Sequence, residues 1–340
     1  MSDEPVYQID LFSLVDSPKF EVVEGRKTWT TFSNSIGSID LVPRFKRGNG
    51  SQIRTTDVKP GENLTIENRY QIQNNELICE IKPALITKKV DGEEQEFHAY
   101  PSDKEELIEK VLFYIAANKG LELRAMPGGV ARYGVSFSLY EIREVLKKIN
   151  KTKPYDLIRQ SLIILRDSST LISQKKENNK ITITHDVFAD AALEVQGKGK
   201  DKDRCFITFS DFVVRQIESQ NYRQYPFEEI QTASQSFARF IHLYMLTNYK
   251  QLNYGDSVGL NLEKIAEAFG KSKTSENQKK RDLRAALKVL SDNGTITHVP
   301  NASNKGGETY YFVEPTEKFI ANLQQSEQKY LELQNEAHRE

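Results

Sequence analysis

One amphipathic segment, residues 276–293, presents a regular row of basic and amide side chains. Its expected core face recurs at helical spacing: Leu283, Ala286, Leu287 and Leu290. The opposite stripe has spacings of 4, 3 and 4 and consists of Asn277, Arg281, Arg284 and Lys288. Arginine can donate two hydrogen bonds to guanine, and asparagine can pair in the same way with adenine. This residue pattern therefore suits a helix that reads the major groove of duplex DNA.

A second segment, residues 154–167, has a similar but less regular pattern. Its expected core residues are Leu157, Ser161, Ile164 and Leu165. Its expected outer stripe is Asp156, Arg159, Gln160, Ile163 and Arg166. Of these, Arg159, Gln160 and Arg166 are candidates for DNA contact, and Lys153 just before the segment is a further candidate.

Lysines lie where loops beside these segments would meet a DNA backbone. Lys175, Lys176 and Lys180 surround the polar tip of a predicted hairpin at 170–184, and Lys305 lies at the glycine-rich tip of a second hairpin. Lys273 and Lys280 lie near the start of segment 276–293. Such positions favour contacts with phosphates, which orient a protein on DNA without reading its sequence.

The charge of the chain is uneven although its formal total is only −1. Residues 138–185 hold ten Lys and Arg against five acidic residues, and residues 271–311 hold eight against four. Two basic islands in a neutral chain indicate two local surfaces that face phosphates. Solvated helix faces have the same composition, so charge alone leaves that simpler interpretation open.

The predicted elements that carry these residues form the same series twice. In the first series, helices start at the capping boxes Ser102–Glu105 and Ser138–Glu141, the helix 154–167 follows, and a hairpin ends the unit. In the second, helices at 233–249, 262–269 and 276–293 precede a hairpin of strands 295–299 and 309–313. Three helices and a hairpin are the order of a winged helix, a variant of the helix-turn-helix.

These patterns predict an α+β fold of two tandem winged-helix domains preceded by a largely flexible N-terminal segment. The expected boundaries are 1–60 for the flexible segment, 61–196 and 204–319 for the two domains, and 320–340 for a polar tail. The chain has no long apolar run and starts with an acidic, polar stretch. We therefore expect a cytoplasmic protein without a membrane anchor or a secretory signal.

The N-terminal segment contains one apolar island, Gln8, Ile9, Asp10, Leu11 and Phe12. An amide followed by two adjacent large apolar groups is how a short linear peptide anchors in a partner's pocket. The five residues resemble the bacterial sliding-clamp-binding pentapeptide, with Ile9 where leucine is commonest. A chance match or a short strand is the simpler alternative.

Enzymatic functions find no support in the residue pattern. The chain has no Walker A motif, because Gly197–Lys200 lacks the required spacing and context. Its five histidines are scattered, and its two cysteines, Cys79 and Cys205, lie far apart, which argues against a metal site and a disulfide scaffold. We expect no catalytic residue, no metal and no cofactor.

The chain as a whole resembles plasmid replication initiators built of two winged-helix domains, most closely the TrfA type. The resemblance runs from Gln8 to about Val313 and is spread over several segments: 8–12, 96–107, 135–142, 202–207 and 290–296. It implies binding to directly repeated sites in duplex origin DNA, opening of an adjacent A·T-rich region, and contact with single-stranded DNA there. It also implies recruitment of the host initiator, helicase and sliding clamp, a monomer–dimer equilibrium, and a role in plasmid copy control.

A tandem winged-helix transcriptional regulator is the alternative from a different functional class. The motif at residues 8–12 favours the initiator, since a repressor has no need to contact a sliding clamp. A nicking enzyme is a third, weaker possibility, which the scattered histidines disfavour.

Overall fold

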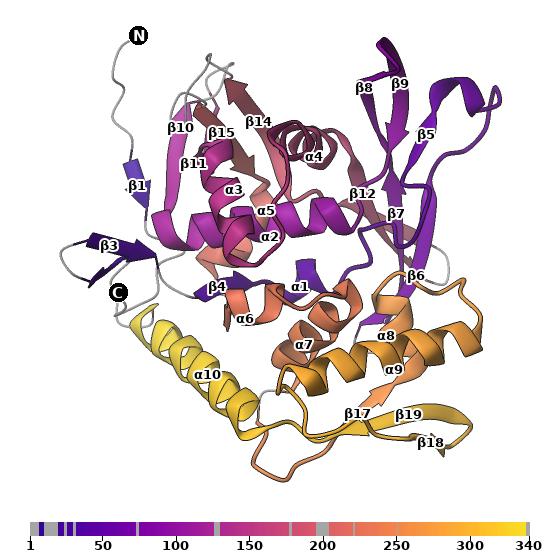
Figure 1. Cartoon of the computed structure of the whole chain (residues 1–340), viewed down its shortest axis with the longest axis vertical. Coiled ribbons are helices and arrows are strands. Elements are labelled where there is room, and N and C mark those ends of the chain that lie inside the picture. Colours follow the sequence, from indigo (N-terminus) through magenta and orange to yellow (C-terminus); the bar gives the residue numbers. More distant parts are fainter. Residues whose placement is uncertain are drawn as a thin grey trace.

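The protein is described from a computed structural model, shown in Figure 1. The structure describes residues 7–9, 20–23, 26–29, 32–72, 75–125, 130–176, 179–194, 204–219, 222–249 and 251–337. It is a mixed α+β chain in which helices alternate with small antiparallel sheets. No helix of this described part is long and apolar enough to cross a membrane.

The first half contains three helices and a hairpin in the expected order. They are α2 (Asp103–Lys119), α3 (Leu139–Lys148), α4 (Tyr155–Asp167), β12 (Ser169–Lys176) and β13 (Asn179–Thr184). The capping boxes predicted at Ser102 and Ser138 are both present. They satisfy backbone N–H groups that the first turn of a helix leaves open. Two strands that the sequence did not predict, β10 (Leu121–Ala125) and β11 (Ala131–Phe137), lie between α2 and α3.

The second half repeats this order. Its helices are α7 (Ser236–Asn248), α8 (Leu262–Ala268) and α9 (Glu276–Asp292), and its sheet has the order β17 (Val258–Asn261), β19 (Glu308–Val313), β18 (Ala302–Lys305). The predicted strand 295–299 is wrong, because the hairpin uses residues 302–305 instead. The N–H groups of Thr295 and Ile296 bond to the carbonyl of Leu290 and close the end of α9, and Ile296 forms only an isolated antiparallel bridge with Pro315, beyond the end of β19.

Five further sheets and five short or terminal helices complete the described part. One sheet has the order β1 (Tyr7–Ile9), β10, β11, β15 (Arg204–Phe209), β14 (Phe188–Glu194), and another has the order β13, β12, β7 (Asn75–Lys82), β6 (Ile66–Ile72). Two more are the sheet β5 (Gln52–Arg54), β9 (Glu93–Ala99), β8 (Ala84–Val90), and the pair β16 (Arg223–Pro226), β4 (Phe32–Ser35). The remaining elements are the hairpin β2 (Phe20–Val23), β3 (Arg26–Trp29), and α1 (Gly37–Asp40), η1 (Thr55–Asp57), α5 (Asp211–Glu218), α6 (Phe227–Gln231) and α10 (Glu317–Ala337).

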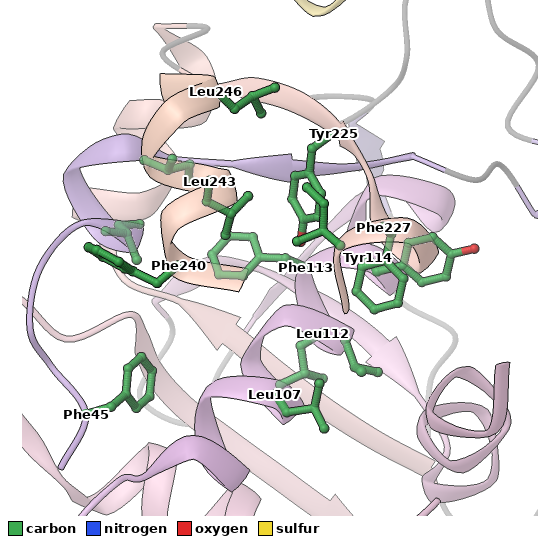
Figure 2. Close-up of a cluster of buried hydrophobic side chains, with 14 of the residues drawn as sticks. Phe45, Leu107, Leu112, Phe113, Tyr114, Tyr225, Phe227, Phe240, Leu243 and Leu246 are labelled. Carbon is green, nitrogen blue, oxygen red and sulfur yellow. The ribbon is translucent and has the colours of Figure 1, made fainter. Parts of the chain in front are cut away.

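One hydrophobic core joins the two halves. Figure 2 shows Phe113 and Tyr114 of α2 among side chains of the second half, and Tyr114 stacks on Phe227 with 4.2 Å between ring centroids. Ile36, Ile39 and Phe45 are buried in the same cluster. Residues 32–60 are therefore part of the folded body, which corrects the predicted flexible segment 1–60 over that stretch. The sequence of this stretch resembles a loop because its few apolar residues are widely spaced. Those residues pack against segments that are distant in the chain.

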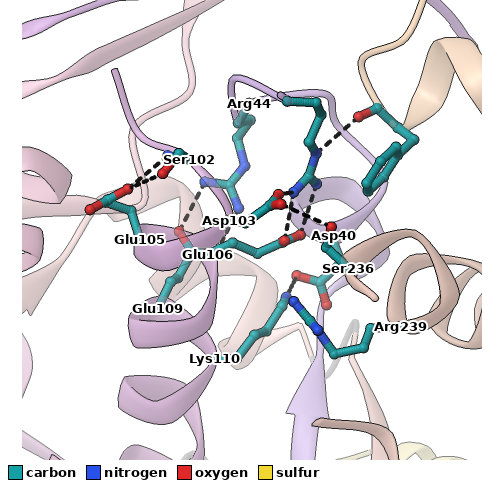
Figure 3. A network of polar contacts seen from close by, with 12 residues as sticks. Asp40, Arg44, Ser102, Asp103, Glu105, Glu106, Glu109, Lys110, Ser236 and Arg239 are labelled. Atoms are coloured by element: carbon teal, nitrogen blue, oxygen red, sulfur yellow. Dashed lines mark hydrogen bonds and ion pairs between the residues drawn. The ribbon is translucent and has the colours of Figure 1, made fainter. Parts of the chain in front are cut away.

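Ion pairs also hold residues 40–47 against α2, as Figure 3 shows. Arg44 pairs with Glu109, with a shortest N–O distance of 2.7 Å, and Lys110 pairs with Asp40. Arg47 pairs with Glu106 at 2.7 Å and donates from Nε to the carbonyl of Phe269 in the second half, at 3.1 Å. Burial alone would raise the pKa of Glu106, but the adjacent Arg47 guanidinium outweighs it and lowers the pKa to about 2. The segment thus connects both halves through Arg47, and its partner Glu106 stays ionised at neutral pH.

The predicted polar tail 320–340 also differs from the structure. Phe319, Ile320 and Leu323 of α10 are buried in the shared core. Arg223 of β16 pairs with Glu327 of α10 at 3.1 Å. A short apolar stripe is enough to dock this helix, although the segment is polar on average.

Candidate nucleic-acid interface

Helix α9 presents the polar stripe that the sequence predicted. Leu283, Ala286, Leu287 and Leu290 are buried in the core. Asn277, Arg281, Arg284 and Lys288 are all exposed. The side chains of this stripe come from one straight, well-anchored helix, which is how a recognition helix offers several groups to successive base edges.

The exposed cations of α9 differ in how they are paired. Lys280 pairs with Glu276 at 2.6 Å, and Lys288 pairs with Asp292 at 3.1 Å. Arg281 donates to the side-chain oxygen of Gln278. Within the described residues, Arg284 has neither a hydrogen bond nor an ion pair. Its guanidinium is thus fully available as a donor on this face.

Two lysines of the same basic island hold α9 in place and do not face outward. Lys279 is buried and pairs with Glu263 of α8, and Lys271 pairs with Asp282 of α9. In the sequence pattern both lysines contribute only to the positive charge of residues 271–311. Lys279 precedes Leu283 by four residues, a spacing that puts it on the core face of the helix, and that signal could have separated it from the outer stripe.

The two remaining candidates of the second half lie on turns beside α9. Lys273 is exposed in the turn between α8 and α9. Lys305 is exposed at the end of β18, before Gly306 and Gly307, whose φ angles of 63° and 84° form the hairpin turn. Figure 1 shows α9 and this hairpin together at the bottom of the view. The arrangement resembles a recognition helix with a wing.

Helix α4 is more enclosed than α9. Leu157, predicted to point inward, is 41% exposed, and the buried stripe is Ile158, Ser161, Leu162, Ile164 and Leu165. The prediction missed Ile158 and Leu162, which continue to Leu165 at helical spacing. Ile163, predicted to point outward, packs on a cluster that includes Ile86 and Phe97. The β8–β9 hairpin therefore covers part of the face that was expected to read DNA.

The polar candidates around α4 are half-buried or paired. Lys153, Arg159, Gln160 and Arg166 are each of intermediate exposure. Arg159 pairs with Asp156 at 3.2 Å, and its Nε is buried without a hydrogen-bond partner in the described part of the chain. Arg166 pairs with Asp167 at 2.5 Å.

The first hairpin places its lysines close together in the ladder. Lys175 of β12 lies opposite Lys180 of β13, and Lys176 lies opposite Asn179. Glu177 and Asn178 between them lie outside the described residues. The backbone register thus gathers the three predicted lysines at one end of the hairpin.

The N-terminal motif is described only in part. Gln8 and Ile9 lie in β1, which pairs antiparallel with β10, so that Gln8 is opposite Glu122 and Ile9 is opposite Leu121. Asp10, Leu11 and Phe12 lie outside the described residues. The short strand that the sequence analysis kept as an alternative therefore occurs over Gln8 and Ile9.

Metal-ligating groups do not gather in the described part of the chain. No group of three His, Cys, Asp or Glu residues there could hold a metal ion. His242 is buried with its Nδ1 at 3.3 Å from the hydroxyl of Thr295. Burial lowers the pKa of this imidazole to about 3, so it is neutral in the folded protein at physiological pH.

Comparisons with known proteins bear on the fold. No protein-family model and no curated protein matches the chain. A crystal structure of domains 2 and 3 of RctB aligns with a TM-score of 0.51 at 12% identity, covering 82% of this chain and 95% of that one. A second RctB domain 2–3 structure gives 0.47 at 11% identity, covering 84% and 99%. The Pi initiator protein in complex with iteron DNA gives 0.42 at 15% identity, covering 62% and 91%. The first of these alignments shows that the chain has the overall fold of RctB domains 2 and 3.

Proposed function

We propose that this chain is a replication initiator that binds directly repeated sites in duplex origin DNA, with α9 as its principal reading helix. The observation that carries the proposal is the exposed stripe of Asn277, Arg281, Arg284 and Lys288 beside a lysine-tipped hairpin. A donor-rich helix of this kind matches the acceptors of guanine and adenine in the major groove. The chain acts by binding and has no catalytic role.

The finer parts of the proposal come from the resemblance to TrfA-type initiators. Binding promotes opening of an A·T-rich region, whose single strand the protein also contacts, and recruits the host initiator, helicase and sliding clamp. The protein works in the cytoplasm, takes part in plasmid copy control, and exchanges between monomer and dimer. The resemblance of Gln8–Phe12 to the clamp-binding pentapeptide supports the clamp contact.

A plasmid-maintenance assay tests the central proposal. A plasmid carries the DNA that flanks the gene, including direct repeats of about 17–22 base pairs, the length of two half-sites one turn apart. It has no other origin, and the chain is supplied in trans. We expect replication with the natural chain, loss of replication with the Arg281→Ala, Arg284→Ala double variant, and full replication with Lys59→Ala, an exposed control far from α9 in sequence. Promoter repression without replication would identify the transcriptional regulator instead.

Titration calorimetry with the purified sliding clamp tests the contact at the N-terminus. The Leu11→Ala, Phe12→Ala double variant should lose most of the binding heat, because a short peptide concentrates its affinity in a few anchors. Asp10→Ala in the same peptide is the matched control and should change little. Undiminished heat from the double variant would remove the clamp from the proposal, while origin binding would stand.

A further inference from the structure

A cluster of cations lies on the β5–β9–β8 sheet, on the face that packs against α4. Alternation along β8 puts Ile86 and Lys88 on that face, with Ile86 packed in the cluster around Ile164 of α4. Arg54 of β5 lies opposite Phe97 of β9, which lies opposite Ile86. Arg54, Phe97 and Ile86 thus form one cross-strand row, and Lys88 is one position further along the same face.

Lys88 is held above this row by two contacts. Its ammonium lies 4.0 Å from the centroid of the Phe97 ring, and it donates to the side-chain oxygen of Gln52 on β5. The lysine therefore reaches across β9 toward β5 and Arg54. Partial burial lowers its pKa, and the positive charges of Lys104 and Arg54 lower it further. Lys104 belongs to the first turn of α2, so three separate elements bring these cations together.

The described part of the chain leaves the charges of the three cations unneutralised. Within the part of the chain that the structure describes, none of Arg54, Lys88 and Lys104 forms an ion pair with a carboxylate. Arg159 and Arg166 of the adjacent α4 both have such partners. Like charges held close together repel one another, so an arrangement of this kind is stabilised when an anion joins it.

We propose that Arg54, Lys88 and Lys104 form a phosphate-binding cluster that holds the DNA backbone beside α4. Arg54 and Lys104 are exposed, so the cluster lies on an open surface that suits a polymer backbone. The β8–β9 hairpin, which covers part of α4, carries Lys88 of this cluster. The first half of the chain therefore contacts the DNA backbone at a place where the partly covered α4 has few side chains free to contact bases. This inference rests on the proposed binding of duplex DNA.

The test measures how origin binding depends on salt for Lys88→Gln and for Lys89→Gln. The two substitutions each remove one positive charge from β8. Because side chains alternate along a strand, Lys89 lies on the opposite face of the sheet from Lys88. Each phosphate contact contributes about 0.9 to the slope of log K against log salt. We expect Lys88→Gln to reduce the slope by about 0.9 and to weaken binding to repeat and random DNA by the same factor, with no change for Lys89→Gln. Equal slopes for the two variants would overturn the inference.

Lys104→Gln provides an independent measurement, because Lys104 is exposed and makes no ion pair within the described residues. It decides the question if Lys88→Gln unfolds in a thermal melt, and it should show the same loss of slope. The two proposals fail differently. A natural chain that does not bind the repeats would refute the proposed function, whereas a natural chain that binds them with slopes unaffected by Lys88 and Lys104 would refute this cluster alone.

Discussion

Helices α4 and α9 occupy the same place in two similar units, yet they present different surfaces. Each is the third helix before a hairpin, and each carries basic and amide residues. The outer stripe of α9 is exposed along its length, whereas the corresponding side chains of α4 are half-buried and Ile163 packs under β8. The same local pattern thus yields an open reading face in one unit and a partly covered one in the other.

The width of the apolar stripe explains this difference. In α9 the buried apolar residues are Leu283, Ala286, Leu287 and Leu290, which one side of the helix accommodates. In α4, Ile163 and Ile164 widen the stripe, and Ile164 is 1% exposed. A helix with a wide apolar face needs a second packing partner. The β8–β9 hairpin is that partner, and it leaves less of α4 for DNA.

The largest expected effect concerns the second packing face of α4. Ile164→Ala should lower the free energy of unfolding by about 2–5 kcal/mol, because it leaves a cavity between α4 and β8. Leu157→Ala on the same helix is the matched control and should cost much less, since Leu157 is 41% exposed. Urea unfolding measures both. Similar losses for the two variants would contradict the packing described for α4.

The next effect concerns base reading by α9. Arg284→Ala and Arg281→Ala should each weaken binding to the repeat by about 1–3 kcal/mol, the value of a bidentate contact to guanine. Binding to random duplex should change far less. Arg159→Ala should cause a smaller difference between the losses on repeat and on random DNA than either α9 variant does, because Arg159 is half-buried and paired with Asp156. Gel-shift titration with both DNAs distinguishes these cases, and equal losses on repeat and random DNA would mean that α9 touches only phosphates.

The first hairpin should act through the DNA backbone. Changing Lys175 and Lys176 together to Ala should reduce the slope of log K against log salt by about one to two units, with little change in the preferred sequence. Binding measured at several salt concentrations gives this slope. An unaltered slope would remove the hairpin from the interface and leave α9 as the main contact.

The smallest effect concerns the exposed pair of Lys288 and Asp292 on α9. Asp292→Asn should change the free energy of unfolding by no more than about 0.5 kcal/mol, since exposed pairs at this spacing contribute little. DNA binding should become slightly tighter, because a negative charge next to the reading face is removed. Thermal unfolding and a binding titration measure the two quantities. A large loss of stability would contradict this, because it would show that the ion pair between Lys288 and Asp292 contributes substantially to the stability of α9.

Patterns of short range were predictable from the sequence. The capping boxes at Ser102 and Ser138 and the exposed stripe of α9 follow from spacings within a single helix, and they occur as expected. The predicted strand 295–299 is wrong, because Thr295 and Ile296 donate their N–H groups at the end of α9 and Ile296 makes only an isolated bridge with Pro315. The DNA contacts of all these residues remain predictions.

By itself, the sequence determined where the capped helices α2 and α3 begin, that a hairpin follows α4, and which side of α9 stays polar, because those properties depend on neighbours within a few residues. Only the tertiary structure decided that Ile36 and Ile39 enter a shared core, that β8–β9 covers α4, and that Arg54 and Lys88 lie on the same face of the β5–β9–β8 sheet. These outcomes join segments far apart in the chain: α1 (Gly37–Asp40), for example, contacts α7 (Ser236–Asn248). They depend on which apolar surfaces pack together when the chain folds. The spacing of residues within one segment does not indicate which distant segment it will pack against.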